Sequence, residues 1–254
     1  MKQKSIILVS FIFMSLCCTA NAQSRAQDDV YLVPDPQTAR WSYMENDADG
    51  KPVGMVYTSV ESMEGDAVNG YLKLRVDEVP LASPEDTLTS FAFYRFKDGE
   101  FMMDLSAVFE RDLLSSAISS ALEKREEEIS EEEIEEAIEK MKSHFKTSGE
   151  IRGIPRHPKV GKLPDFDYQL KLSIFSMKVQ GEQRRIVGTE RIHTEAGSFD
   201  CFILEETITM KIMMVKEVEK IRSWYAYGIG MVKENTYDKK DKLISTMILK
   251  EINW

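Results

Sequence analysis

The fold is decided by residues 200–215, which read DCFILEETITMKIMMV. Apolar and polar side chains alternate along this stretch, and successive side chains of a strand point to opposite faces of a sheet. A period of two therefore predicts a β-strand with one buried face. The same period runs from Leu170 to the end of the chain and predicts strands at residues 170–179, 184–193, 200–215, 219–227, 230–238 and 243–252, with breaks at Gly181, Gly197 and Gly228.

The first half of the chain predicts a second set of strands. Residues 41–103 read as a β-meander, with turn signals at Asp49-Gly50, Glu64-Gly65, Asn69-Gly70 and Asp98-Gly99. The first of these turns resembles the one at Lys240-Asp241-Lys242. This likeness is a hint of duplication that falls short of an internal repeat.

Between the two β-rich halves the hydrophobic period changes to that of a helix. Residues 104–147 predict an inserted helical hairpin, because apolar residues recur there at spacings of three and four and Ser130 with Glu133 forms a capping box. A basic, proline-containing connector follows at residues 149–168. The predicted fold is mainly β (α+β): a long curved antiparallel sheet or partial barrel of about ten strands, with the helices on its concave side.

The N-terminus predicts export. Lys2 and Lys4 precede a short apolar run, and Ala20-Asn21-Ala22 fits the cleavage rule, so residues 1–22 read as a bacterial signal peptide and the mature protein starts at Gln23. A lipoprotein modification at Cys18 is the weaker interpretation. We expect a periplasmic protein with a single β-rich domain at residues 23–254. Only Cys201 would remain after cleavage, so no intramolecular disulfide is expected.

Composition narrows the classes of partner. The 254 residues carry a formal net charge of -10, and no basic face dominates, which argues against nucleic acid. After signal cleavage no apolar run approaches the roughly 20 residues that a transmembrane helix needs.

Metal and cofactor sites are not predicted. The loop Glu45–Gly50 resembles a calcium loop, but Val56 stands where the bidentate carboxylate belongs, so a hairpin turn is favoured. The three histidines lack zinc-ligand spacing. Met210, Met213 and Met214 are better explained by core packing than by copper. There is no nucleophile elbow, P-loop or dinucleotide fingerprint, so no enzymatic activity is expected and a hydrolase is a remote alternative.

Three residues stand out as candidate ligand contacts. Glu206 is the only charged residue on the face formed by Phe202, Leu204, Ile208, Met210 and Ile212. If that face is buried, Glu206 is a carboxylate in an apolar setting and a candidate ligand contact; the alternative is a bulge that turns Glu205 and Glu206 outward. Arg156 and Lys159, in the basic connector, could contact an anionic head group or pair with the acidic helix.

A resemblance is carried by residues 188–201 and 224–233, which read GTERIHTEAGSFDC and WYAYGIGMVK. These segments resemble the TapB-like group of exported bacterial proteins of unknown function. The resemblance implies membership of an exported β-rich family, and it supplies no catalytic or ligand residues.

Two functions are expected in order of preference. The first is a non-catalytic periplasmic protein that binds a lipid-like or other envelope molecule in a groove between the curved sheet and the helices. The alternative is a structural or interaction protein of the cell envelope that binds a protein partner through the acidic helix or a sheet edge.

Overall fold

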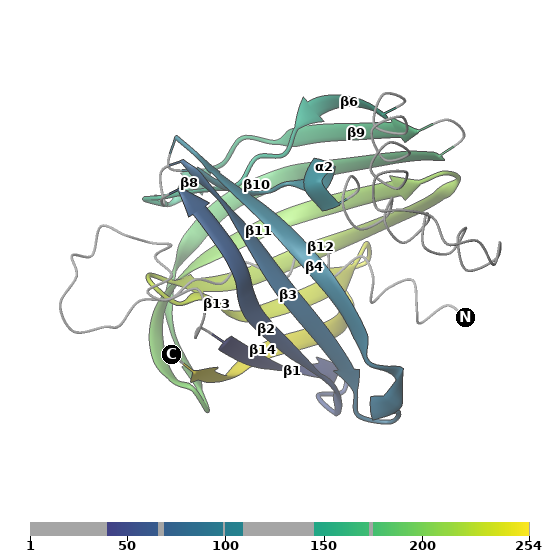
Figure 1. Cartoon of the computed structure of the whole chain (residues 1–254). Helices are drawn as coiled ribbons and strands as arrows, with labels where there is room; N and C mark the ends of the chain where they lie inside the picture. Colours follow the sequence, from purple (N-terminus) through teal and green to yellow (C-terminus); the bar gives the residue numbers. More distant parts are fainter. Residues whose placement is uncertain (1–39, 66–68, 99, 109–144, 173–174, 254) are drawn as a thin grey trace.

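The structure is a computed structural model that describes residues 40–65, 69–98, 100–108, 145–172 and 175–253. Within these residues the chain is nearly all-β (Figure 1). The strands are β1 (Arg40–Asp47), β2 (Pro52–Gly65), β3 (Gly70–Pro80), β4 (Leu88–Lys97), β5 (Glu100–Met103), β6 (Phe145–Glu150), β7 (Ile154–Pro155), β8 (Gly161–Lys162), β9 (Phe166–Leu172), β10 (Phe175–Thr194), β11 (Gly197–Ile212), β12 (Val215–Ala226), β13 (Gly230–Asp238) and β14 (Leu243–Asn253). A 3₁₀ turn, η1 (Pro84–Asp86), and a short helix, α2 (Leu105–Val108), complete the described elements.

The described strands form one 14-stranded antiparallel sheet. Its order is β6-β9-β10-β11-β12-β13-β14-β1-β2-β3-β4-β5-β7, and β8 pairs with β10 beside this path. The first and last strands are neighbours, with Arg40 opposite Asn253. The N-terminal meander and the C-terminal strands therefore join through the β1–β14 ladder in the middle of the sheet, while β6 and β7 lie at its two edges.

The sheet folds over itself so that its two halves share a core. Figure 1 shows β2, β3 and β4 crossing in front of the strands of the C-terminal half. The larger buried cluster combines residues of both halves, such as Leu72 and Tyr94 with Phe202 and Tyr225. We call the face that carries these residues the inner face. Burial of apolar area from both halves stabilises this crossing.

A second buried cluster covers the far end of the inner face. It contains Phe166 and Leu170 of β9, Val179 of β10, Met210 of β11 and Ile221 of β12. The alternation that these strands show in the sequence is thus explained by burial of one face.

Two hairpin turns have the same geometry. In the turn after β1, Asp47 N–H donates to the Lys51 carbonyl (2.9 Å), and Asp47 Oδ1 accepts from the amides of Asp49 and Lys51. The turn at Asp238–Lys242 repeats these contacts at matching positions. The aspartate side chain replaces a backbone acceptor, as in an Asx turn. The loop at Glu45–Gly50 is therefore a hairpin turn, as expected.

The predicted fold class is wrong. The described chain is nearly all-β with 14 strands, rather than α+β with about ten strands and an inserted helical hairpin. Within the predicted hairpin, the described part holds only α2, and the end predicted as helix up to residue 147 is the strand β6, which pairs with β9. Pairing with β9 stabilises a strand there, although the local spacing of apolar residues is that of a helix. Residues 109–144 of the predicted hairpin lie outside the described residues.

The connector, the predicted break at Gly181 and the predicted strand at residues 200–215 also differ from the structure. Residues 149–168 contain the strands β7 and β8, and the start of β9, rather than an open connector. Gly181 lies within the continuous strand β10, where its missing side chain accommodates the ring of Phe166. The β11–β12 hairpin turns at Met213-Met214, with Met213 at a φ of 54°, a left-handed conformation that sequence rules reserve for Gly or Asn.

No helix among the described residues is long and apolar enough to cross a membrane. The predicted signal peptide, residues 1–22, lies outside the described residues. The division into a leader and a single domain therefore stays a prediction.

Candidate functional site

Glu206 lies on the inner face of β11, at the boundary between the two buried clusters. The neighbours on its face, Phe202, Leu204, Ile208 and Met210, are all at most 4% exposed. Its own side chain is 10% exposed. The expected placement of a carboxylate on a buried face is therefore observed.

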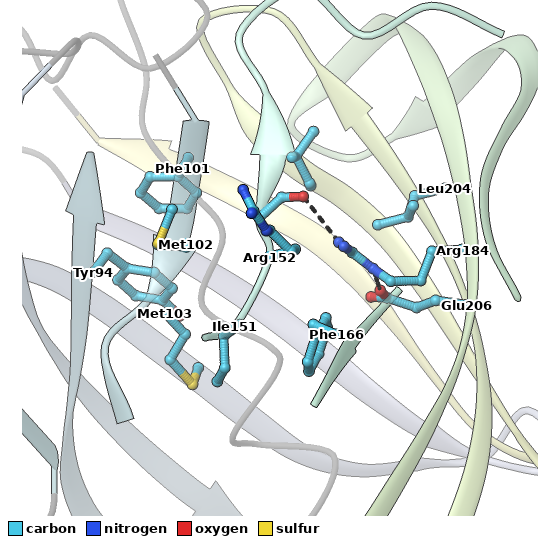
Figure 2. A pocket seen from close by; sticks show the side chains of 12 residues that line it. Tyr94, Phe101, Met102, Met103, Ile151, Arg152, Phe166, Arg184, Leu204 and Glu206 are labelled. Atoms are coloured by element: carbon cyan, nitrogen blue, oxygen red, sulfur yellow. Dashed lines mark hydrogen bonds and ion pairs between the residues drawn. The ribbon is translucent and has the colours of Figure 1, made fainter. Parts of the chain in front are cut away.

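The partner of Glu206 is Arg184, which the sequence analysis missed. Arg184 Nε donates to Glu206 Oε2 at 2.8 Å, and the arginine side chain is only 2% exposed. A charge-assisted hydrogen bond of this kind offsets the cost of burying both charges. Figure 2 shows the pair within the protein interior.

A β-bulge in β10 turns Arg184 toward Glu206. Glu182 pairs with Thr207 and Arg185 pairs with Glu205, so the two residues Gln183 and Arg184 stand opposite Glu206 alone. Gln183 has a φ of 55°. The extra residue shifts the alternation, so that Arg184 points inward and Arg185 outward, which is how bulges redirect side chains. The bulge that the sequence analysis considered for β11 thus occurs in its neighbour β10.

Arg184 also forms hydrogen bonds to the backbone of two segments, one before β7 and one before β9. Its Nη1 donates to the carbonyl of Pro164 and its Nη2 to the carbonyl of Gly153, both at 2.9 Å. The guanidinium lies 5.0 Å from the centre of the Phe166 ring. Because every donor group named here has a protein acceptor, the Arg184–Glu206 pair acts as a structural clamp.

One space beside this clamp is small. The pocket lined by Arg184, Glu206, Phe166 and Tyr94 has a volume of about 30 Å³ (Figure 2). A space of this size holds about one water molecule. A space of this volume does not hold an amphiphile, but Arg184 and Glu206 also line a groove of about 1000 Å³ beside β8, so the assignment of Glu206 as a ligand contact stays a prediction.

Two further buried glutamates lie on the inner face without a cation within hydrogen-bonding distance among the described residues. Glu234 of β13 is 3% exposed, and its Oε2 accepts a hydrogen bond of 2.9 Å from Ser223 Oγ. Burial, together with the nearby Glu206 and Glu219, raises the pKa of Glu234 to about 8. Burial and the nearby Glu217 raise the pKa of Glu219 to about 7. Glu234 is therefore largely protonated at neutral pH, and Glu219 partly so.

A second pair of acids, Glu45 and Glu78, lines an open groove at the end of β1, β2 and β3. Glu45 lies opposite Gly54 and Glu78 opposite Val56, and the position that a Gly54 Cβ would take is 3.3 Å from Glu45 Oε2. Burial raises the pKa of Glu45, and burial with the charge of Glu45 raises the pKa of Glu78 to about 8. We call this space the Glu45–Glu78 groove.

The Glu45–Glu78 groove is mostly apolar. Its volume is about 700 Å³, and Val53, Val56 and Leu81 are among its lining residues. Apolar walls with a few convergent polar groups are typical of small-molecule sites. Sequence alternation alone pointed to one inner acid, Glu206, whereas Glu45, Glu78, Glu219 and Glu234 interrupt the apolar face of their strands in the same way and could have been found by the same reasoning.

A larger groove of about 1000 Å³ lies beside β8, and its lining includes Arg184 and Glu206. Its charged side chains are paired with one another. Arg185 Nη2 lies 2.7 Å from Glu205 Oε2, Arg222 Nη1 lies 3.6 Å from Glu205 Oε1, and Lys220 Nζ lies 2.6 Å from Asp241 Oδ1. Because these charged groups already form ion pairs with one another, they are less available to a ligand than the two carboxyl groups of the Glu45–Glu78 groove.

The other predicted contacts lie elsewhere. Arg156 is half-buried and Lys159 exposed, both between β7 and β8, and neither lines the grooves described above. Neither residue lines the two spaces that Glu206 lines.

Nucleophile and metal chemistry have little support in the described residues. Cys201 is buried, and burial raises the pKa of its thiol to about 12, so it is a thiol rather than a thiolate at neutral pH. His193 Nδ1 lies 2.6 Å from Ser198 Oγ at the exposed end of the β10–β11 hairpin. Among the described residues no group of three or more His, Cys, Asp or Glu residues could hold a metal ion.

Comparisons with known proteins give a fold and a partial family match. Residues 154–249 match the DUF3108-like family, which is less than half of the chain. A protein from Bacteroides fragilis, described as exported and as having a YmcC-like fold, is similar with a TM-score of 0.54 and 17% identity, over 93% of this chain and 99% of that one. A protein from Parabacteroides distasonis, described as a lipoprotein, has a TM-score of 0.55 and 16% identity, over 85% of this chain and 94% of that one.

No curated protein matches this chain. The resemblance to the TapB-like group is not confirmed under that name. At these identities the two structures share the fold alone, and β7 to β14 carry the match to the DUF3108-like family, so the chain is similar to DUF3108-like and YmcC-like proteins.

Proposed function

We propose that this protein is a non-catalytic component of the bacterial cell envelope that holds a small amphiphilic molecule in the Glu45–Glu78 groove. The single observation that carries the proposal is the groove itself. Its volume of about 700 Å³ and its mostly apolar lining suit a ligand with an alkyl or ring portion.

The two carboxylates indicate the polar end of the ligand. Glu78 has a pKa of about 8 because it is buried and lies near Glu45. An amine or another hydrogen-bond donor placed between the two carboxyl groups relieves their repulsion and favours their charged forms. The ligand class that fits is therefore an amphiphile with a cationic or hydrogen-bond-donating head group.

Location in the envelope has separate support. The N-terminal pattern is that of an exported protein, and the two structures of similar fold are described as an exported protein and a lipoprotein. Cell fractionation with N-terminal sequencing of the purified protein tests this point, and we expect a periplasmic or membrane-anchored product that lacks the leader.

The partner-binding alternative through a sheet edge has less support. At one edge β6 is short and Gly149 has a φ of 80°, and at the other β7 has two residues, one of them Pro155. Short, irregular or proline-containing edges resist strand addition.

Native mass spectrometry of the protein purified from its own periplasm tests the ligand. We expect a bound amphiphile in the wild type that is lost in Gly54→Leu, because the added side chain occupies the groove. Gly188→Leu is the matched control, since a Cβ at Gly188 meets nothing within 4 Å. Equal ligand occupancy in Gly54→Leu and in the wild type, or a wild type without any ligand, would overturn the proposal.

Replacement of the two acids separates shape from charge. Glu45→Gln with Glu78→Gln keeps the groove volume and removes both ionisable groups. We expect the double variant to lose cationic amphiphiles and to keep neutral ones. Unchanged binding of a cationic amphiphile would rule out the role of the carboxylates.

A further inference from the structure

The tip of the β11–β12 hairpin is apolar and exposed. Met213 is 43% exposed, Met214 94% and Val215 61%. Hairpin tips are normally polar, with Gly or Asn at positions that need a positive φ. Three consecutive exposed apolar residues at a tip are a feature of surfaces that contact a partner.

The turn is held in place by the sheet. Ile212 pairs with Val215, so only Met213 and Met214 form the loop. The Met213 N–H donates to the carbonyl of Ser176 on β10 at 2.8 Å. Met213 also has a positive φ of 54°, a conformation that costs free energy for a residue with a side chain. The hairpin thus presents its methionines on a fixed support.

Lysines surround this tip on one face of the sheet. Lys178, Lys211 and Lys216 are direct neighbours across β10, β11 and β12. Lys171 lies two residues from Gln169, the partner of Lys178, and therefore on the same face, and Lys146 is opposite Lys171. We call these five residues the lysine patch: Lys146, Lys171, Lys178, Lys211 and Lys216.

The charge of the patch is unusual for this chain. Like charges directly opposite each other destabilise a sheet, and the net charge of the whole protein is -10. Of the five lysines, Lys178 has an acidic partner among the residues that the structure describes, with its Nζ 2.6 Å from Asp167 Oδ2. Lys146, Lys171, Lys211 and Lys216 are exposed. An anionic surface complements such a patch.

We infer that the β11–β12 hairpin docks on an anionic membrane surface, with Met213, Met214 and Val215 entering the interface and the lysine patch contacting lipid phosphates. Apolar insertion combined with basic side chains is how peripheral proteins bind anionic bilayers. The site lies on a different face from the Glu45–Glu78 groove, so docking does not require the proposed function to be correct.

Vesicle flotation tests the inference with the protein as purified from the periplasm. We expect binding to vesicles of phosphatidylethanolamine and phosphatidylglycerol that weakens with salt, and weak binding to phosphatidylcholine alone. Met214→Glu lowers binding by about tenfold or more because it places a charge in the interface. Val160→Glu, at another exposed apolar residue, is the matched control and keeps wild-type binding.

Two further variants test the contribution of the lysine patch and that of the apolar tip separately. Lys211→Ser with Lys216→Ser lowers affinity for the anionic vesicles by about tenfold, since each lysine near an anionic surface contributes to binding. Met214→Trp shows a blue-shifted emission with these vesicles if the tip enters the interface. The inference is overturned if the wild type does not float, if Met214→Glu binds like the wild type, or if the tryptophan emission does not shift. Gly54→Leu should float normally, which separates docking from ligand binding.

Discussion

Two buried glutamates on the same inner face have opposite surroundings. Glu206 faces Arg184, whose guanidinium donates to its carboxylate, whereas Glu234 accepts a hydrogen bond from the Ser223 hydroxyl. Glu206 thus forms an ion pair, whereas burial raises the pKa of Glu234 to about 8. The two buried carboxyl groups therefore differ electrostatically because different residues face them.

The largest expected effect comes from removing the arginine. Arg184→Met leaves Glu206 buried without a counterion and frees the carbonyls of Gly153 and Pro164. We expect the free energy of unfolding in urea to fall by about 3–5 kcal/mol. If the loss is no larger than that of a surface arginine, the clamp has no structural role. Replacing both partners by apolar residues should recover part of the loss.

Neutralising Glu206 has the next largest effect. Glu206→Gln keeps the shape but removes the charge that Arg184 contacts, and we expect a loss of about 2 kcal/mol at neutral pH by urea unfolding. The same change at Glu234 should be nearly neutral under these conditions, because that carboxyl group is already largely protonated. Equal losses in the two variants would remove the distinction between the two sites.

The pH dependence sharpens the comparison. The pKa of Glu234 rises on folding from 4.5 to about 8, so between these values the folded protein retains a proton that the unfolded chain loses. Stability contributed by this group is full below pH 4.5 and is lost as the pH rises toward 8. Glu234→Gln has no group that titrates in this range. We therefore expect its free energy of unfolding at about pH 9 to exceed that of the wild type by about 1 kcal/mol or more. Parallel pH profiles of the urea midpoint would contradict this expectation, and Glu219, with its raised pKa, is mutated separately as a control.

The smallest effect is expected at the neighbouring exposed pair. Arg185 lies next to Arg184 and pairs with Glu205, but its side chain is 62% exposed. Arg185→Met should lower the free energy of unfolding by less than about 1 kcal/mol, because water screens the pair. Thermal melts that compare Arg185→Met with Arg184→Met measure how much more an inward-pointing arginine contributes to stability than its outward-pointing neighbour.

Local sequence patterns predicted the strand pattern well where the physical cause is local. Alternation placed Glu206 on a buried face, and Asp-Gly signals found the turn after β1. The likeness between that turn and the one at Lys240-Asp241-Lys242 is matched by identical hydrogen bonds. Period and turn chemistry act over a few residues, so they can be read from one sequence.

Errors arose where distant segments decide the outcome. The spacing of apolar residues around Phe145 is that of a helix, but the segment forms β6 because it pairs with β9. Gly181 lies within a strand because the ring of Phe166 fills the space above it. The Met213-Met214 turn has no turn-forming residue and depends on the pairing of β11 with β12 and a hydrogen bond to β10.

The sequence by itself determined that this chain is rich in half-buried β-strands, where most of its tight turns lie and which carboxylate of β11 faces inward. The tertiary structure decided that β1 pairs with β14, that a bulge brings Arg184 to Glu206, and that Glu234 faces the Ser223 hydroxyl and no such cation within the described part of the chain. The reason is physical: alternation and turns depend on neighbours in the chain, whereas strand order, bulges and ion pairs depend on residues that only folding brings together.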